Sequence, residues 1–401
     1  MEIKEGLELN NTATSAITPD TTLKELQLLR DRIISAASPQ ALFGELEGAN
    51  TEKLAALNTK YFKLAKQCGV SNELTDPKAI DLSREAFEAL SELYRSAQES
   101  IRHDGYGDAT AITKAATDET VLAVVQAGQN VYSLRELLAE GDVAMVYRAS
   151  YEDEKGVAHK VCVKIAKNTA DNELIANEQK ILAKLKHVSL PQLIEEFELP
   201  DGRAATALSF AEGYNFHQLR DMPIHSNGLK DPDYHIGWIL ERQLSVLGYL
   251  HSCGIVHGSV EPAHLIVQPQ THNVVLIDFC WAVKNPTEKK HIKIAQEFYS
   301  APEVYAKEKP HPGMDIYGLG KSAIYLVGGD PGMSDLPDSI DRMYGKFLER
   351  MKEESTEIRA NDAYQLARHL LVIRDEVSGQ NRGFSPLPTK EASAEENSQD
   401  V

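Results

Sequence analysis

The sequence predicts an α+β protein in which an all-helical N-terminal domain precedes a β-rich part and then a large helical part. Apolar residues recur at helical spacing between residues 20 and 107. From Val131 the pattern changes to short β-rich runs separated by turn residues, and from residue 232 the helical spacing returns. The 401 residues, 42% of them hydrophobic, are enough for two domains with buried cores.

Two apolar stripes define the predicted helical domain, residues 20–107. One stripe lies in "NTEKLAALNTKYFKLAKQ" and the other in "SREAFEALSELYRSAQESI", each with apolar side chains three or four residues apart. Glycines at 105 and 107 are expected to end the last helix. The stripes consist of Leu54, Leu57, Tyr61 and Leu64, and of Phe87, Leu90, Tyr94, Ala97 and Ile101.

The remaining boundaries follow from changes in composition. Residues 108–128 are predicted to be a linker, and residues 129–377 a second domain. Its strands are expected in "VYSLRELL", "AMVYRAS", "KVCVKIAK", "PQLIEEFEL" and "RAATALSF", with a helix in "DNELIANEQKILAKLKH". Residues 378–401 are polar and are predicted to be a disordered tail.

Composition limits the classes of function. The net charge of −18 argues against binding to nucleic acid or to an anionic membrane surface. The four cysteines are far apart and form no C-x-x-C pair, which argues against a disulfide framework and a zinc site and favours the reducing cytoplasm. No apolar run approaches the about 18 residues of a membrane span, and the acidic start "MEIKEGLELNNT" is unlike a signal peptide.

Three early motifs of the second domain resemble the nucleotide-binding elements of protein kinases. In "LLAEGDVAMVYRA", Gly141 stands at one position of the glycine-rich loop, with Ala139 and Ala144 at the other two. "VCVK" ends in Lys164, where the family places a lysine that pairs with phosphates, and Glu178 in "NEQKILAKLKH" stands where the family places that lysine's carboxylate partner. The resemblance implies a two-lobed fold and ATP as a possible ligand. The alternatives are an ordinary β-turn, a surface lysine and a solvated helix carboxylate.

The segment "VHGSVEPAHLIV" resembles the catalytic loop of the family, but its chemical residues are changed. His257 keeps the scaffold of the motif, whereas Ser259 stands at the catalytic aspartate, Glu261 at the lysine and His264 at the metal-binding asparagine. A serine hydroxyl is not a base near neutral pH. Two like charges about 4 Å apart repel by roughly 4 kcal/mol at an effective dielectric near 20, so Glu261 would oppose a phosphate. Imidazole is also a poor substitute for an oxygen ligand of magnesium.

The following motifs complete the resemblance, which covers about residues 129–375. "DFC" supplies Asp278, the expected ligand of a magnesium or manganese ion, although an aspartate that caps a turn is the alternative. Cys280 replaces the glycine of that motif, which restricts the backbone. Glu303 and Arg359 stand where the family has a buried ion pair, and Asp315 where it has a carboxylate that braces the catalytic loop. The resemblance therefore implies a pseudokinase, with residues for the nucleotide present and residues for phosphate transfer replaced.

The helical domain resembles a J domain, the co-chaperone module that activates heat-shock ATPases. The likeness covers about residues 38–107 and is carried by the aromatic residues Phe87 and Tyr94 and by the closing "HDGYG". The family's His-Pro-Asp tripeptide should follow "KLAKQ", where this chain has "CGVS". ATPase stimulation is therefore not predicted, and a plain three-helix bundle is the alternative.

Three functions remain open from the sequence. The first is a cytoplasmic pseudokinase that binds a protein partner as a scaffold or allosteric regulator, with ATP as a possible ligand. The second is an active, atypical Ser/Thr kinase or another phosphoryl or nucleotidyl transferase, in which Glu261, His264 or Asp278 takes over metal binding or base duty. The third is a co-chaperone adaptor that uses the kinase fold as an interaction surface. A basic group in the segment after "DFC", Lys289, Lys290, His291 and Lys293, is a possible contact for an acidic partner, with a solvated loop as the alternative.

Overall fold

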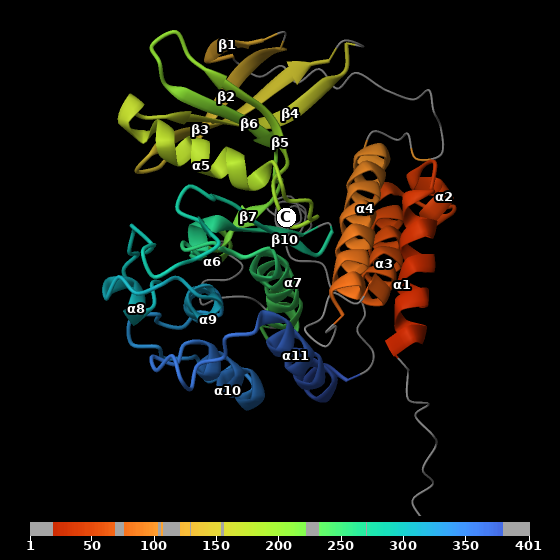
Figure 1. The fold of residues 1–401 in the computed structure, drawn as a ribbon, viewed down its shortest axis with the longest axis vertical. Helices are drawn as coiled ribbons and strands as arrows, with labels where there is room; N and C mark the ends of the chain where they lie inside the picture. Colours follow the sequence, from red (N-terminus) through yellow and green to blue (C-terminus); the bar gives the residue numbers. More distant parts are fainter. Residues whose placement is uncertain are drawn as a thin grey trace, which may run out of the picture.

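The computed structural model has the three predicted parts, and the α+β fold class is confirmed (Figure 1). A group of helices stands beside a two-lobed unit, whose upper lobe is a curled sheet and whose lower lobe is mainly helical. The described residues are 19–68, 76–102, 106, 121–128, 130–153, 156–221, 232–269 and 271–379.

The described residues of the N-terminal part form four helices. They are α1 (Pro19–Ile34), α2 (Pro39–Phe43), α3 (Asn50–Cys68) and α4 (Pro77–Arg102). Both predicted stripes are buried in one core, where the rings of Tyr61 and Tyr94 stack with centroids 4.1 Å apart. The positions expected for the J-domain tripeptide, 69–71, and most of "HDGYG" lie outside the described residues.

The small lobe contains a six-stranded antiparallel sheet in the order β1-β2-β3-β4-β6-β5. Glu195 on the last strand accepts hydrogen bonds from Asn130 (2.8 Å) and Tyr132 (2.6 Å) on the second, so the sheet curls until its two edges meet. The helix α5 (Asn172–Leu182) packs on the sheet. The strands are β1 (Ala123–Ala127), β2 (Asn130–Glu140), β3 (Ala144–Glu152), β4 (Ala158–Ala166), β5 (Leu193–Glu198) and β6 (Ala204–Ser209).

The strand β1 lies inside the segment predicted to be a linker. Its residues Ala123–Ala127 pair with β2, and Gly128, at φ 51°, follows directly. Sequence patterning missed this strand because its side chains do not alternate between buried and exposed: Val124 is 61% exposed, and only Ala127 is buried. The pairing of backbone groups at the sheet edge, rather than burial of a face, accounts for the strand. Of the predicted linker, residues 108–120 lie outside the described residues.

The large lobe is built around α7 (Pro232–Ser252) and α9 (Pro312–Leu326), whose apolar side chains share one core. The other helices are α6 (Phe216–Arg220), α8 (Pro302–Tyr305), α10 (Arg342–Met351) and α11 (Ala363–Ser378). The helix α11 extends one residue into the predicted tail, and residues 380–401 lie outside the described residues. Short strands form two further small sheets, one in the order β10-β9-β7 and one of β11 and β8. They are β7 (Tyr214–Asn215), β8 (Ile255–Val256), β9 (Leu265–Gln268), β10 (Asn273–Leu276) and β11 (Val283–Lys284).

Two buried carboxylates fix the lower lobe as the sequence motifs predict. The guanidinium of Arg359 donates two hydrogen bonds to Glu303, at 2.6 and 2.9 Å. Asp315 accepts hydrogen bonds from the backbone N–H groups of His257 (2.9 Å) and Gly258 (2.8 Å), which ties α9 to the segment that follows β8. Satisfied buried charges of this kind hold a loop in one conformation.

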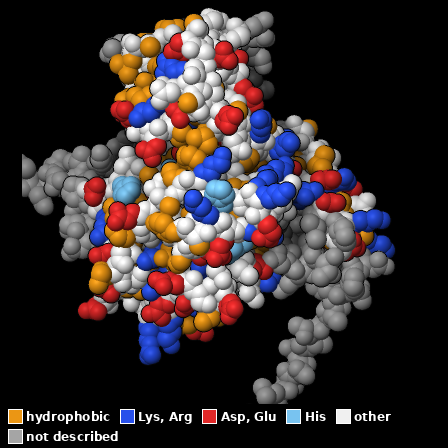
Figure 2. Space-filling model, turned by 60° about the vertical axis from the view of Figure 1, so that its left-hand side comes forward, with side chains coloured by type: hydrophobic (Ala, Val, Ile, Leu, Met, Phe, Trp, Pro, Cys, Tyr) orange, Lys and Arg blue, Asp and Glu red, His pale blue; other side chains and the backbone are white. Residues whose placement is uncertain are grey.

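The surface carries charges of both signs. On the face drawn in Figure 2, acidic and basic side chains are interspersed over both lobes, and a group of basic side chains lies beside the waist between them. Although the net charge is −18, the acidic side chains on that face do not form one uniform patch. Among the described helices, none combines the length and the hydropathy that crossing a membrane requires.

Candidate functional site

Lys164 lies at the centre of the candidate site, between the two lobes. On β4 the side chains of Val161 and Val163 enter the core of the curled sheet, so the alternation of the strand turns Lys164 away from them. Its Nζ lies 3.1 Å from Glu178 Oε2 on α5 and 3.0 Å from Asp278 Oδ1. The ion pair expected from the sequence is therefore formed, and Asp278 joins it.

Neighbouring charges favour the ionised forms of Lys164 and Asp278. Burial opposes the charge on Lys164, but the negative charges of Asp278 and Glu178 outweigh burial and raise its pKa well above the usual value. Burial likewise opposes the charge on Asp278, but Lys164 and then His264 outweigh it and lower the pKa of that carboxyl. A buried pair of this kind is costly to break because the remaining charge would lose its partner.

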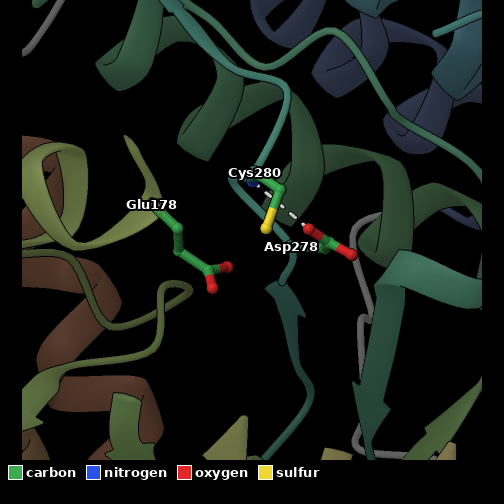
Figure 3. A group of neighbouring side chains, drawn as sticks. All are labelled: Glu178, Asp278 and Cys280. Atoms are coloured by element: carbon green, nitrogen blue, oxygen red, sulfur yellow. Dashed lines mark hydrogen bonds between the residues drawn. The ribbon is translucent and has the colours of Figure 1, made fainter. Parts of the chain in front are cut away.

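Three possible metal ligands converge here, and the lysine ammonium already occupies their centre. Figure 3 shows Glu178 and Asp278 pointing toward a common space, with the thiol of Cys280 beside it. One ligand atom of each lies within 4.8 Å of the others. Lys164 Nζ is also 3.2 Å from Cys280 Sγ, and burial raises the pKa of that thiol, so a metal-binding thiolate is disfavoured. We therefore assign the cluster to the ammonium group and not to a metal.

The segment from Asp278 to Cys280 is tied to α5 through backbone groups. The N–H of Phe279 donates to Glu178 Oε1 at 2.8 Å, and the side-chain amide of Asn177 donates to the carbonyls of Cys280 and Ala282, both at 3.0 Å. Asp278 itself has φ 67°, an uncommon value for a residue other than glycine. The role of Asn177 could not be predicted from the sequence, because only the fold brings it to a segment about a hundred residues away.

The replaced catalytic loop forms a closed group of contacts around His264. Its Nδ1 lies 2.8 Å from the carbonyl oxygen of Ser259 and 3.4 Å from Glu261 Oε1. Its Nε2 lies 3.5 Å from Asp278 Oδ2. Burial raises the pKa of Glu261, while the charge of His264 acts in the opposite direction. His264 thus links the three positions at which the family carries its transfer and metal-binding groups.

These residues, as arranged, do not fit a magnesium ion. Asp278 Oδ1 is paired with Lys164 and accepts from the N–H of Cys280 at 3.2 Å, while Oδ2 faces His264. The position of the second oxygen ligand holds an imidazole, and magnesium requires oxygen ligands in near-octahedral order. A nucleotide finds a partial fit: Lys164 is correctly placed, but the N–H of Gly141 is used in a 2.9 Å bond to the carbonyl of Ala144.

The loop that follows Gly141 packs against α5 and against Cys280. Val143 is buried in a small apolar cluster with Ala144, Ile175 and Cys280. This cluster joins the tip of the loop to α5 and to Cys280, which stands where the family motif has glycine. Cys280 therefore has two contacts that glycine cannot make, one to this cluster and one to Lys164.

Comparison with known proteins agrees with this geometry. A family model described as "Protein kinase domain" matches residues 132–376, more than half of the chain. Among curated relatives, Serine/threonine-protein kinase fused of Drosophila melanogaster is 28% identical over 207 residues, which are 50% of this chain and 24% of that protein. Serine/threonine-protein kinase TIO of Arabidopsis thaliana is 29% identical over 210 residues, 51% of this chain and 15% of that protein.

A shorter relative is covered more fully. Calcium/calmodulin-dependent protein kinase type 1B of Homo sapiens is 24% identical over 250 residues, which are 60% of this chain and 70% of that protein. The chain spans only 24% of fused and 15% of TIO, so the likeness concerns the domain and not those whole proteins. The two-lobed fold, the Lys164–Glu178 pair and the match over residues 132–376 agree, and the chain belongs to the protein kinase domain family.

Proposed function

We propose that the chain is a pseudokinase, a kinase-fold protein that binds a protein partner as a scaffold or allosteric regulator and does not transfer phosphate efficiently. One observation carries the proposal. His264 contacts Ser259 and faces both Glu261 and Asp278, so the positions of the transfer groups satisfy one another. A substrate hydroxyl would find no carboxylate at position 259 to orient it and accept its proton.

Restoring the family residues tests this proposal. The wild type and the triple variant Ser259→Asp, Glu261→Lys, His264→Asn would be compared for transfer of labelled phosphate from ATP to themselves and to a general protein substrate. We expect background labelling for the wild type and a gain on the order of a hundredfold for the variant, the size of a general-base contribution.

A second function, an active atypical kinase, has its own support. Lys164, Glu178 and Asp278 keep their mutual contacts, and the relatives are named as serine/threonine-protein kinases. Wild-type labelling that disappears in Lys164→Ala, in a sample whose unfolding transition shows that it is folded, would establish this alternative and refute the pseudokinase proposal. Equal background for the wild type and the triple variant would show that the loss of transfer does not lie in these three residues.

ATP is proposed as a ligand of Lys164 rather than as a phosphate donor. A nucleotide that binds only the folded chain raises its melting temperature. We expect ATP to stabilise the wild type and not Lys164→Ala, with little added by magnesium or manganese because both oxygens of Asp278 already face partners. If neither metal nor ATP changes the melting temperature, nucleotide is not a ligand and the fold serves as an interaction surface alone.

For the helical domain we propose a binding role on a J-like scaffold, without ATPase stimulation. The support is the absence of His-Pro-Asp after "KLAKQ" and the shared aromatic core of α3 and α4. We place the protein in the reducing cytoplasm, in keeping with its four free thiols. A measured increase in the ATPase rate of a heat-shock chaperone by the full chain would overturn the first part of this proposal.

A further inference from the structure

The helices α3 and α4 pack directly against the kinase domain (Figure 1). The hydroxyl of Tyr249 on α7 donates to Glu88 Oε1 on α4 at 2.8 Å, and the side-chain amide of Asn58 on α3 donates to the carbonyl of Thr271 at 2.5 Å. The side chain of Val188, from the loop after α5, belongs to the apolar core of the helical domain. The contact thus joins the helical domain to three separate segments of the kinase domain.

The loop between α5 and β5 is clamped at the centre of this contact. The rings of His187, Phe87 of α4 and Tyr249 pack as a triangle. The centroid of His187 lies 4.9 Å from that of Phe87 and 5.2 Å from that of Tyr249, and those two are 6.4 Å apart. The hydroxyl of Tyr249, which donates to Glu88, also accepts the backbone N–H of Lys186 at 3.1 Å. One hydroxyl therefore connects a carboxylate of the helical domain to the backbone just beyond α5.

The other side of the same loop is fixed to the large lobe. Ser189 Oγ donates to Asn273 Oδ1 at 2.7 Å, and the amide of Asn273 donates to the carbonyl of Val188 at 3.2 Å. The N–H of Leu276 on β10 donates to the carbonyl of Ser189 at 2.9 Å. Because the loop is held from two sides, its position depends on the helical domain as well as on the lobe.

The clamped loop follows directly on α5, the helix that carries Glu178. Glu178 lies about one turn before Leu182, the last residue of α5, and Lys186 follows four residues after that end. Its two oxygens serve different partners, the ammonium of Lys164 and the N–H of Phe279. A shift or rotation of α5 would disturb both contacts, because both end on one carboxylate.

We propose that the helical domain is an intramolecular brace that holds α5 in place and thereby keeps Glu178 on Lys164 and Phe279. In this proposal the helical domain acts on the kinase domain of the same chain, through its contacts with the loop that follows α5. Anything that separates α4 from this loop, such as a protein that competes for the surface of α4, loosens the cleft from a distance. The two sites are coupled through packed side chains and hydrogen bonds with Tyr249 as the link.

Backbone hydrogen exchange in the full chain tests the brace, because the N–H groups of Lys186 and Phe279 report on the loop and on α5. Glu88→Ala removes the acceptor for Tyr249, and we expect exchange at both N–H groups to accelerate about tenfold, as for the loss of a charge-assisted hydrogen bond. Glu88→Gln keeps an acceptor and should restore most of the protection.

Glu85→Ala is the matched control. Glu85 lies one turn earlier on α4 and pairs with Arg30 of α1 at 2.8 Å, inside the helical domain. This variant should leave both N–H groups protected. His187→Ala, made from the kinase side, should reproduce the effect of Glu88→Ala without altering α4.

The outcomes separate a brace from simple packing. If exchange accelerates at Lys186 but not at Phe279 in Glu88→Ala and His187→Ala, the contact is local and the proposal is overturned. Equal acceleration throughout the large lobe, measured at Leu370 in the core of α11, would indicate general destabilisation and would equally reject a specific brace.

Discussion

At the scale of single residues, the cleft is organised by Lys164. Its ammonium contacts two carboxylates and a thiol that come from α5 and from the segment after β10. The cation offsets the negative charges of the buried Glu178 and the partly buried Asp278, and it lowers the pKa of Asp278. The lysine therefore has a structural role that does not depend on a nucleotide.

This role predicts a large loss of stability for Lys164→Met. The substitution leaves Glu178 and Asp278 facing each other without a cation, and removing one partner of a buried pair costs about 3 to 5 kcal/mol. Lys160→Met, on the same strand, is the control, because Lys160 pairs with Glu212 at the surface and such pairs contribute at most about 1 kcal/mol. Urea unfolding of both variants measures the difference. Equal stability of Lys164→Met and wild type would show that the carboxylates do not need the ammonium.

At the scale of elements, the loop that begins at His257 depends on a glycine where the family motif has arginine. Gly258 has φ 80°, and a Cβ atom there would lie 3.2 Å from Ile292 Cγ1 and 3.3 Å from the carbonyl of Trp281. Its N–H is held by Asp315, so the loop has little freedom to relax. The change from arginine to glycine thus alters the backbone of the loop as well as its charge.

We predict that Gly258→Ala lowers the free energy of unfolding by about 1 to 2 kcal/mol, the cost of the left-handed conformation for a residue with a Cβ. Gly345→Ala in α10 is the matched control: the nearest atom to its Cβ would be Leu336 Cδ1 at an ordinary 3.5 Å, and alanine favours a helix by up to about 1 kcal/mol. Thermal or urea unfolding should therefore shift in opposite directions for the two variants. A stabilised Gly258→Ala would contradict the assigned backbone strain.

The elements that could be predicted from the sequence are those whose pattern is local. The stripe from Phe87 to Ile101 specifies α4, and the alternation around Val161 specifies β4. The strand β1 could not be predicted because its edge pairing buries only Ala127. In the site, motif order identified Lys164 and Glu178 as partners. The contacts of His264 and Asn177 could not be predicted, because they join segments that only the fold brings together.

At the scale of the whole molecule, one buried histidine joins the loops to the core and makes stability depend on pH. His257 is fully buried, with its ring 4.6 Å from that of Phe279. Its Nε2 donates to the carbonyl of Ile277 at 3.1 Å, and its Nδ1 accepts the N–H of Ser259 at 3.3 Å. This pattern suits the neutral ring, and burial lowers the pKa of His257 to about 4.

The lowered pKa gives the direction of the pH effect. Since the unfolded chain binds a proton near pH 6.5 and the folded chain near pH 4, the stabilisation from His257 is complete above about pH 6.5 and is lost as the pH falls toward 4. Carboxyls with lowered pKa values, Asp278, Asp315 and Glu303 (about 2), lose their contributions only below about pH 4. The burial of Glu261 acts in the opposite direction, so a variant is needed to isolate the histidine.

We therefore predict that wild-type stability falls between about pH 7 and pH 4.5, with His257 contributing up to roughly 3 kcal/mol of the loss by pH 4. His257→Leu, which keeps an apolar contact for Phe279, should be less stable at pH 7 but should show a flatter pH dependence. His291→Asn, at an exposed histidine, should follow the wild type. Urea unfolding midpoints measured across this pH range compare the pH dependence of the wild type and the two variants. An equal slope for wild type and His257→Leu would mean that the ring can be protonated in the folded chain without loss of stability, and the prediction would be wrong.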